Sequence, residues 1–183
     1  MVIEKLRIAA SAAVRGGYNP QMDYRELICK QKEAVHRRTR EVAGMLRDAD
    51  LTWRPEKDAL CVGEMLRHLW MSEEGVRRAA LDGDFSYYEK RIPQGLRAVL
   101  GTPGTLADEL AQMEKVHLET LRLVTAFPPE RMDEERVHEP LGFRRKIFAL
   151  LLGITEHEVH HRAQLMVYLR MLGRPVPESI NRR

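Results

Sequence analysis

Cysteine is nearly absent from this chain, which has only Cys29 and Cys61 in 183 residues. One disulfide is the most they could form, so the fold does not depend on an oxidising compartment and we expect a cytoplasmic protein. Long apolar runs are also missing. The longest candidate, residues 147–154, falls far short of the roughly 18 residues that a membrane-spanning helix needs. No membrane partner is therefore expected.

A strong excess of one charge is missing as well. The 30 Lys and Arg residues nearly balance 27 Asp and Glu, and the basic clusters at residues 36–40, 144–146 and 181–183 are small. Aromatic residues make up only 6% of the chain and none interleaves with these clusters, as a nucleic-acid stacking platform would require. We expect no nucleic-acid partner. With 44% hydrophobic residues, the composition indicates one globular domain.

No segment has a convincing strand pattern, whereas four segments repeat apolar residues at intervals of three and four, as amphipathic helices do. The predicted helices cover residues 22–46, 61–82, 105–127 and 145–172. Four such helices predict an all-α fold, a four-helix bundle.

Local signals mark the helix ends. Cys61 is expected at the start of the second helix, while Thr105 and Asp108 form a capping-box variant at the start of the third. Gly173 and Pro175 follow the fourth helix in the order typical of a helix C-terminus.

The rest of the chain is predicted to be connections and an extension. Residues 82–103 are rich in glycine and include Pro93, so we expect a long connection between helices two and three, with a short helix around residues 94–100. Residues 1–20 are interpreted as an N-terminal extension, which leaves residues 21–178 as the bundle domain.

Three of the seven histidines fall within five residues. His157 and His161 lie one helical turn apart and interrupt the apolar stripe that should pack into the bundle, whereas His160 points to one side. Buried imidazoles need partners, and this spacing suits one divalent metal ion shared by His157 and His161. The pair alone is equally compatible with histidines that are hydrogen-bonded in the core.

A third ligand must come from another helix, and the spacing leaves two candidates. His68 lies on the flank of the second helix's apolar stripe, and His117 interrupts the stripe of the third helix and could also be a fourth ligand. His36, among arginines, and His138, in a predicted loop, are expected at the surface. Three imidazoles with no fourth protein ligand would form an open site, as in catalytic zinc sites.

Other polar residues are candidates for supporting roles. Gln164 could hydrogen-bond a metal-bound water. A ligating imidazole could donate a hydrogen bond to Glu73, Glu156 or Glu158. Arg162 could hold an anionic substrate at the mouth of the site.

Several motifs resemble those of the DinB-like metalloprotein family, over about residues 22–178. They are Trp53–Pro55, Val62–Leu69, His157–Leu165 and Leu172–Pro177. The resemblance implies a four-helix bundle, commonly a homodimer, that binds one divalent metal ion, zinc or nickel, through His68, His157 and His161. Some members of the family are thiol S-transferases that use low-molecular-weight thiols.

Three functional hypotheses follow. The first is a metal-dependent enzyme, a thiol S-transferase or hydrolase, that activates water or a low-molecular-weight thiol. The second is a non-catalytic, metal-stabilised dimeric bundle with a stress-response or binding role. The third is a metal-free bundle whose histidines pair with carboxylates. No feature of the sequence identifies the substrate or the catalytic residues.

Overall fold

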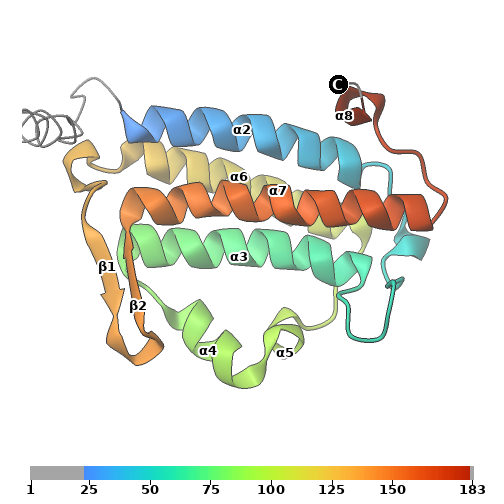
Figure 1. Cartoon of the computed structure of the whole chain (residues 1–183), viewed down its shortest axis with the longest axis horizontal. Coiled ribbons are helices and arrows are strands. Elements are labelled where there is room, and N and C mark those ends of the chain that lie inside the picture. Colours follow the sequence, from blue (N-terminus) through green and yellow to red (C-terminus); the bar gives the residue numbers. More distant parts are fainter. Residues whose placement is uncertain (1–22, 182–183) are drawn as a thin grey trace, which may run out of the picture.

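The computed structural model describes residues 23–181 (Figure 1), so the predicted extension over residues 1–20 lies outside it. The elements in chain order are α2 (Tyr24–Ala43), a 3-10 turn (Asp48–Asp50), α3 (Val62–Asp82), α4 (Ser86–Gln94), α5 (Leu96–Leu100), α6 (Leu106–Ala126), a 3-10 turn (Pro129–Arg131), β1 (Glu135–His138), a 3-10 turn (Glu139–Leu141), β2 (Phe143–Lys146), α7 (Ile147–Met171) and α8 (Glu178–Asn181). Within this part of the chain, no helix is long and apolar enough to cross a membrane.

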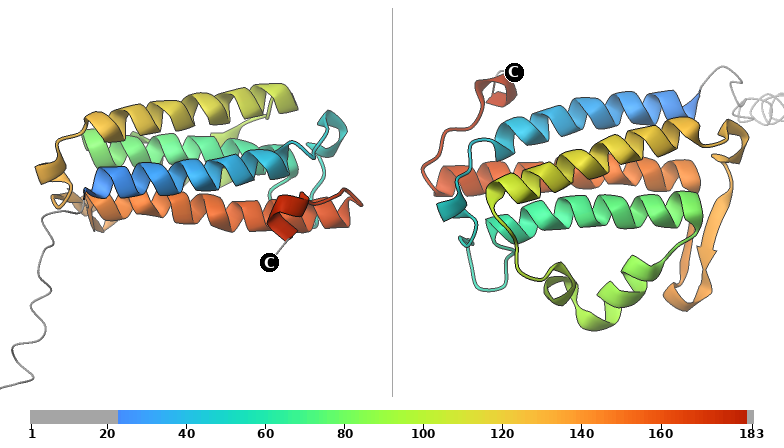
Figure 2. Two further views of the ribbon diagram at one scale, coloured as in Figure 1. Left: turned by 90° about the horizontal axis from the view of Figure 1, so that it is seen from above. Right: turned by 180° about the vertical axis from the view of Figure 1, so that it is seen from behind.

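Helices α2, α3, α6 and α7 form the predicted four-helix bundle. Both α2 and α3 pack against α6 and against α7. Figures 1 and 2 show that α2 and α7 run in one direction while α3 and α6 run in the other. Because α3 and α6 run the same way, the chain must return along the bundle between them. The segment that contains α4 and α5 makes this return, which explains the long connection.

The predicted helix ends are confirmed at three positions. The Thr105 hydroxyl accepts from the backbone N–H of Asp108, whose carboxylate accepts from the N–H of Thr105, so the capping box is complete. Cys61 caps α3 in the same way, with Glu64 as its partner. Gly173 follows α7 with φ +65, a left-handed conformation that favours glycine.

The expected absence of strands is wrong. Strands β1 and β2 form an antiparallel hairpin in which Glu135 pairs with Lys146 and His138 with Phe143. Each strand has four residues, and half of the eight are both charged and exposed. The alternation that would identify a strand is therefore too short and too polar to see. The last helix consequently begins at Ile147 rather than Arg145, which belongs to β2.

The long connection contains more structure than expected. The predicted short helix is α5, but α4 was missed. Its nine residues include Pro93 in the last turn and none is fully buried, so it lacks the apolar stripe of a core helix. Gly75 of α3 allows α4 to approach closely, since a Cβ there would lie 2.4 Å from the ring of Tyr87.

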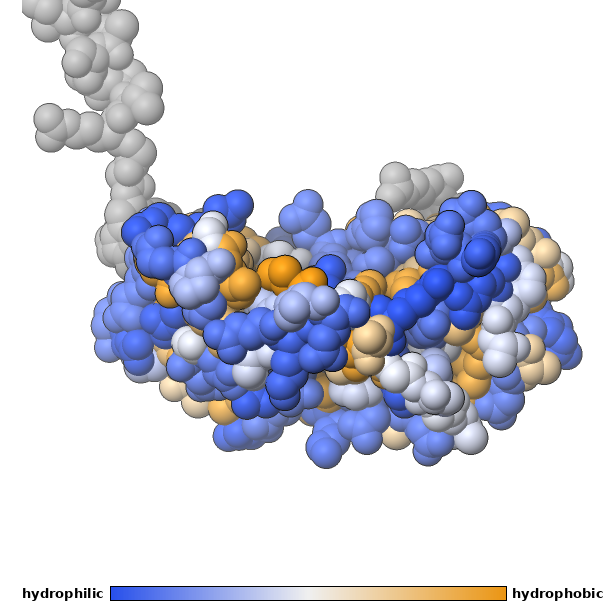
Figure 3. Space-filling model, turned by 90° about the horizontal axis from the view of Figure 1, so that it is seen from below, coloured by the Kyte–Doolittle hydropathy of each residue, from blue (hydrophilic) through white to orange (hydrophobic). Residues whose placement is uncertain are grey.

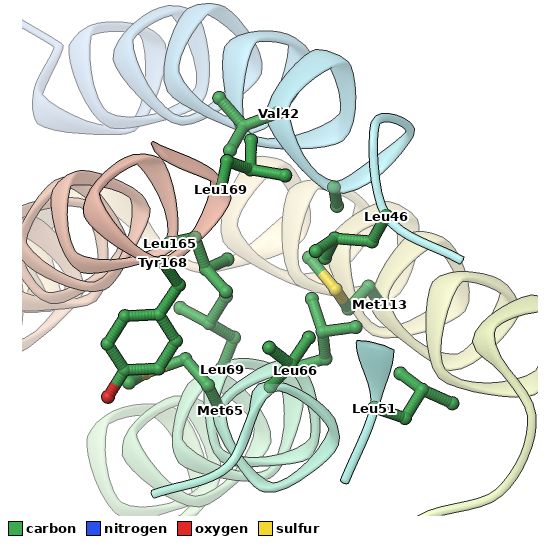
Figure 4. Close-up of a cluster of buried hydrophobic side chains, with 12 residues drawn as sticks. Val42, Leu46, Leu51, Met65, Leu66, Leu69, Met113, Leu165, Tyr168 and Leu169 are labelled. Atoms are coloured by element: carbon green, nitrogen blue, oxygen red, sulfur yellow. The ribbon is translucent and has the colours of Figure 1, made fainter. Parts of the chain in front are cut away.

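Two apolar clusters fill the bundle, with a polar layer between them. The first, drawn in Figure 4, includes Val42, Leu46, Leu66, Leu69, Met113, Leu165 and Leu169. The second, nearer the hairpin, includes Ile28, Leu81, Val124, Ile147 and Leu151. Between them lie the buried polar side chains of Lys32, His36, His68, Ser72, Glu73, His117, Glu158 and His161. The middle of the bundle is therefore where chemistry can occur.

Candidate metal centre

Three imidazoles from two neighbouring helices meet in this polar layer. His157 and His161 extend from successive turns of α7, and His68 faces them from α3. The Nε2 atom of His157 lies 3.0 Å from the Nε2 atoms of both His68 and His161. One ligating atom from each residue falls within 4.8 Å of the others. The structure thus brings together the three histidines that the family resemblance implies.

The opposite ring nitrogens of two of these histidines have hydrogen-bond partners. The Nδ1 of His68 lies 2.9 Å from the Ser72 hydroxyl, which also contacts the Tyr87 hydroxyl. The Nδ1 of His161 lies 2.7 Å from the Oε1 of Gln164, an acceptor, so this nitrogen donates. A proton on Nδ1 leaves the Nε2 lone pair free to bind a metal ion. Gln164 therefore orients an imidazole through Oε1, and its hydrogen bond to a metal-bound water stays a prediction.

Burial keeps these imidazoles neutral. Burial, with smaller contributions from neighbouring imidazoles and Arg91, lowers the pKa of His68 to about 3 and that of His157 to about 4. Burial also lowers the pKa of His161. Because a metal ligand must be the neutral imidazole, all three side chains are in the ligating form at neutral pH.

The donor set fits a divalent transition metal. Imidazole nitrogen suits zinc and nickel, and three protein ligands leave further coordination positions open. His160 is exposed beside His161, as expected.

The structure separates His117 from this cluster. Its ring stacks on that of His36, with centroids 3.8 Å apart and planes 8° apart. The predicted surface position of His36 is wrong, because this side chain is only 4% exposed. His138 is not in a loop but ends β1, half-buried, with its Nε2 3.0 Å from Glu89. The prediction that His117 lies on the buried face of α6 is confirmed, since its side chain is only 5% exposed. The spacing did not predict that its neighbour is His36.

Glu73 does not support an imidazole of the cluster. Its carboxylate pairs with the Lys32 ammonium at 2.6 Å, and Glu158 contacts the same ammonium at 2.5 Å. His36 completes this network, with its Nδ1 3.3 Å from Glu158. Burial acts to raise the pKa of Glu158, but His36 and Lys32 outweigh it and lower the pKa to about 2.

Lys32 was missed, although the sequence holds a signal for it. It lies four residues after Ile28 and four before His36, both buried, so it occupies the inner face of α2. Lysine is almost never fully buried unless it is paired, and the sequence does not show which carboxylates would pair with Lys32. Its place on the inner face of α2 was therefore not enough to predict a core residue.

Arg162 is directed away from the predicted anion-binding position. Its guanidinium donates to the backbone carbonyl of Val35 on α2, at 3.3 Å. A different arginine, Arg91 of α4, lines a cavity of about 360 Å³ that opens beside His157 between α3, α4, β2 and α7. Nothing in the sequence marks Arg91, because its role depends on how α4 folds back over α3.

Comparison with known proteins gives the chain's relatives. YjoA of Bacillus subtilis strain 168, named as an uncharacterized protein, is 24% identical over 138 residues, which cover 74% of this chain and 82% of YjoA. The crystal structure of YjoA, described as DinB-like, matches with a TM-score of 0.66 at 20% identity, covering 82% of this chain and 95% of that one.

Two other solved structures share the fold. A DinB-like protein from Bacillus cereus ATCC 10987 has a TM-score of 0.66 at 16% identity, over 83% of this chain and 95% of its own. YfiT from Bacillus subtilis has a TM-score of 0.62 at 15% identity, over 87% and 92%, and is described as a probable metal-dependent hydrolase with an unusual four-helix bundle topology. The sequence pattern of the DinB superfamily matches residues 31–165. That match covers well over half of the chain, which therefore belongs to the DinB superfamily.

Proposed function

We propose that this protein binds one divalent metal ion through His68, His157 and His161 and is a metal-dependent enzyme, in the first place a hydrolase. The observation that carries the proposal is the convergence of the three Nε2 atoms. Two hydrogen bonds support it: Gln164 Oε1 accepts from Nδ1 of His161 and so fixes the tautomer that a ligand needs, and the Ser72 hydroxyl contacts Nδ1 of His68 and orients its ring.

Zinc or nickel is the proposed ion, since both bind imidazole nitrogen. Such an ion supplies a Lewis acid that activates water, a thiol or a carbonyl group. The chain contributes three neutral ligands and an adjoining cavity. The hydrolase class agrees with the description of YfiT, a relative in fold.

Transfer of a low-molecular-weight thiol is the second candidate. Hydrolysis and thiol transfer both begin with activation of a nucleophile, so they differ in what the cavity admits. The arginine that lines this cavity, Arg91, favours an anionic co-substrate. The alternative is a non-catalytic bundle that the metal ion merely stabilises.

Elemental analysis of untagged protein tests the metal site. We expect about one zinc or nickel ion per chain in the wild type and its loss in His68→Ala, His157→Ala and His161→Ala. His160→Ala, an exposed neighbour, and His117→Ala are matched controls that should keep the ion. Absence of metal after reconstitution with zinc or nickel, or equal retention in all variants, would contradict the proposal.

A turnover screen then separates the functional candidates. Metal-loaded protein is incubated with ester, amide and electrophilic substrates, with and without a low-molecular-weight thiol. Turnover that does not need the thiol supports a hydrolase, and turnover that requires it supports an S-transferase. A full complement of metal with no turnover in either condition supports the non-catalytic bundle.

A homodimer is part of the same proposal. Val167 and Met171 of α7 are 51% and 57% exposed, and would supply an apolar contact between two copies. Sedimentation analysis should give the mass of a dimer for the wild type and of a monomer for Val167→Glu. A wild-type monomer at micromolar concentration would contradict it.

A further inference from the structure

The cavity beside His157 is shaped by elements outside the four-helix core. Its walls come from α3, α4, β2 and α7, and its volume of about 360 Å³ is within the usual range for small-molecule sites. The Nε2 atom of His138 in β1 lies 3.0 Å from Oε1 of Glu89 in α4, so the hairpin contacts α4 directly. His157, one of the three convergent imidazoles, lines it. The cavity thus leads directly to the candidate metal centre.

Two arginines lining this cavity lack a carboxylate partner. Within residues 23–181, neither Arg91 nor Arg145 forms an ion pair, and the one side-chain hydrogen bond of Arg145 goes to the carbonyl of Arg144. By contrast, Arg67 pairs with Glu109 and Arg174 with Asp50. Unpaired guanidinium groups in a cavity are available to a ligand.

Acidic side chains do not cancel the charge of Arg91. Two carboxylates line the cavity, those of Glu73 and Glu156. Glu73 is already paired with the buried Lys32 ammonium at 2.6 Å. Glu156 and Arg145 are both exposed and offset one another, which leaves the charge of the half-buried Arg91. The cavity therefore favours a negative charge on its occupant.

The remaining wall is apolar and aromatic. The rings of Tyr88 and Phe143 lie with centroids 6.3 Å apart, and Leu150 and Ile154 of α7 complete this side. Burial raises the pKa of the Tyr88 hydroxyl to about 12, so it stays protonated as a hydrogen-bond donor. Figure 3, which views the molecule from below relative to Figure 1, shows hydrophobic residues exposed among hydrophilic ones on that face.

We infer that this cavity is the substrate site and that it takes a small organic anion, an apolar or aromatic body bearing a carboxylate, with Arg91 as the principal anion contact. Tyr88 and Phe143 contact the body, and the reacting group faces His157. The inference deepens the proposed function and rests on it for the reaction, but binding of the anion depends on residues outside the metal site.

Calorimetric titration with matched probes tests this inference. Phenylacetate carries the charge and the aromatic body, and phenylacetamide has nearly the same shape without the charge. We expect phenylacetate to bind the wild type at least tenfold more tightly than phenylacetamide. Equal affinities, or no binding of phenylacetate at millimolar concentration, would overturn the inference.

Three variants assign the preference to Arg91. Arg91→Gln should weaken the binding of phenylacetate at least tenfold and leave the affinity for phenylacetamide unchanged. Arg91→Lys, which keeps the charge, should recover part of the lost affinity. Arg37→Gln is the matched control, because Arg37 is an exposed arginine on α2 that does not line the cavity. An unchanged affinity for phenylacetate in Arg91→Gln, with its helical circular dichroism intact, would refute the assignment.

The same titrations after treatment with a chelator separate this inference from the proposed function. If the preference for phenylacetate persists and still depends on Arg91, the anion site belongs to the chain itself, even if elemental analysis finds no metal. If the preference vanishes with the metal and Arg91→Gln has no effect beforehand, the anion binds the metal alone and the inference fails.

Discussion

At the scale of single residues, the buried ammonium of Lys32 holds together two carboxylates that could not otherwise stay in the core. Glu73 and Glu158 both lie within 2.6 Å of it, and all three side chains are less than 10% exposed. Replacing such an ion group by apolar residues can be neutral, but removal of one partner leaves an uncompensated buried charge. Lys32 thus links α2, α3 and α7 across the bundle.

We therefore expect Lys32→Met to lower the free energy of unfolding by about 3–5 kcal/mol, measured by urea denaturation at pH 7. Lys30→Met is the matched control, since Lys30 lies on the same helix with its side chain 72% exposed and should change stability little. A similar small effect in both variants would show that the network is not held by Lys32.

His117 gives the metal-free protein a stability that depends on pH. Burial, with the stacked His36 and nearby Lys32, lowers the pKa of His117 from 6.5 to about 3. Between these values the unfolded chain takes up a proton that the folded chain does not, so stability falls as pH falls. From pH 7 to pH 5 this single group accounts for about 2 kcal/mol.

Urea denaturation of chelator-treated protein at pH 7 and pH 5 measures this effect. The loss of stability on acidification should be smaller by about 2 kcal/mol in His117→Gln than in the wild type. Identical losses would mean that His117 is protonated equally in both states.

At the scale of elements, the packing of α4 on α3 depends on Gly75. A Cβ at Gly75 would lie 2.4 Å from Cδ1 and 2.6 Å from Cγ of Tyr87, so α4 would have to move. The movement would displace Arg91, which lies on the same helix, and would also disturb the contact of Tyr87 with Ser72, the partner of His68. Gly153 of α7 offers the contrast, because nothing lies within 4 Å of a Cβ placed there.

Gly75→Ala should destabilise the protein by about 1–3 kcal/mol through overpacking, and hydrogen exchange should quicken in residues 86–94. Gly153→Ala should stabilise it by about 0.5–1 kcal/mol, since alanine in a helix loses less backbone entropy. Unfolding by urea compares the two variants with the wild type. If the amides of α4 were as protected from hydrogen exchange in Gly75→Ala as in the wild type, α4 would not depend on close packing at Gly75.

At the scale of the whole molecule, the candidate metal site joins two helices that are far apart in sequence. His68 lies on α3, and His157 and His161 lie on α7, beyond the return connection and the hairpin. An ion bound there stabilises the folded state and not the unfolded state, because the unfolded chain does not bring the three ligands together.

Metal should therefore stabilise the fold by mass action. At a free concentration 100 times the dissociation constant, zinc or nickel should add about 2.7 kcal/mol. Thermal unfolding, followed by circular dichroism with excess metal and with chelator, should show a higher Tm for metal-loaded wild type and no difference for His68→Ala. An equal rise in Tm for that variant would place the ion elsewhere.

The sequence by itself determined the four main helices, their caps at Cys61 and Thr105, and the position of His157 and His161 on one face of α7. These features depend on residues three or four apart, whose geometry any helix fixes. The family motif over Val62–Leu69 also implied His68 as the third ligand. Only the tertiary structure decided that His117 stacks on His36, that Lys32 joins Glu73 and Glu158, and that Arg91 lines the cavity. Such neighbours depend on which helices pack together and on the path of α4, and these follow from burial summed over the whole chain.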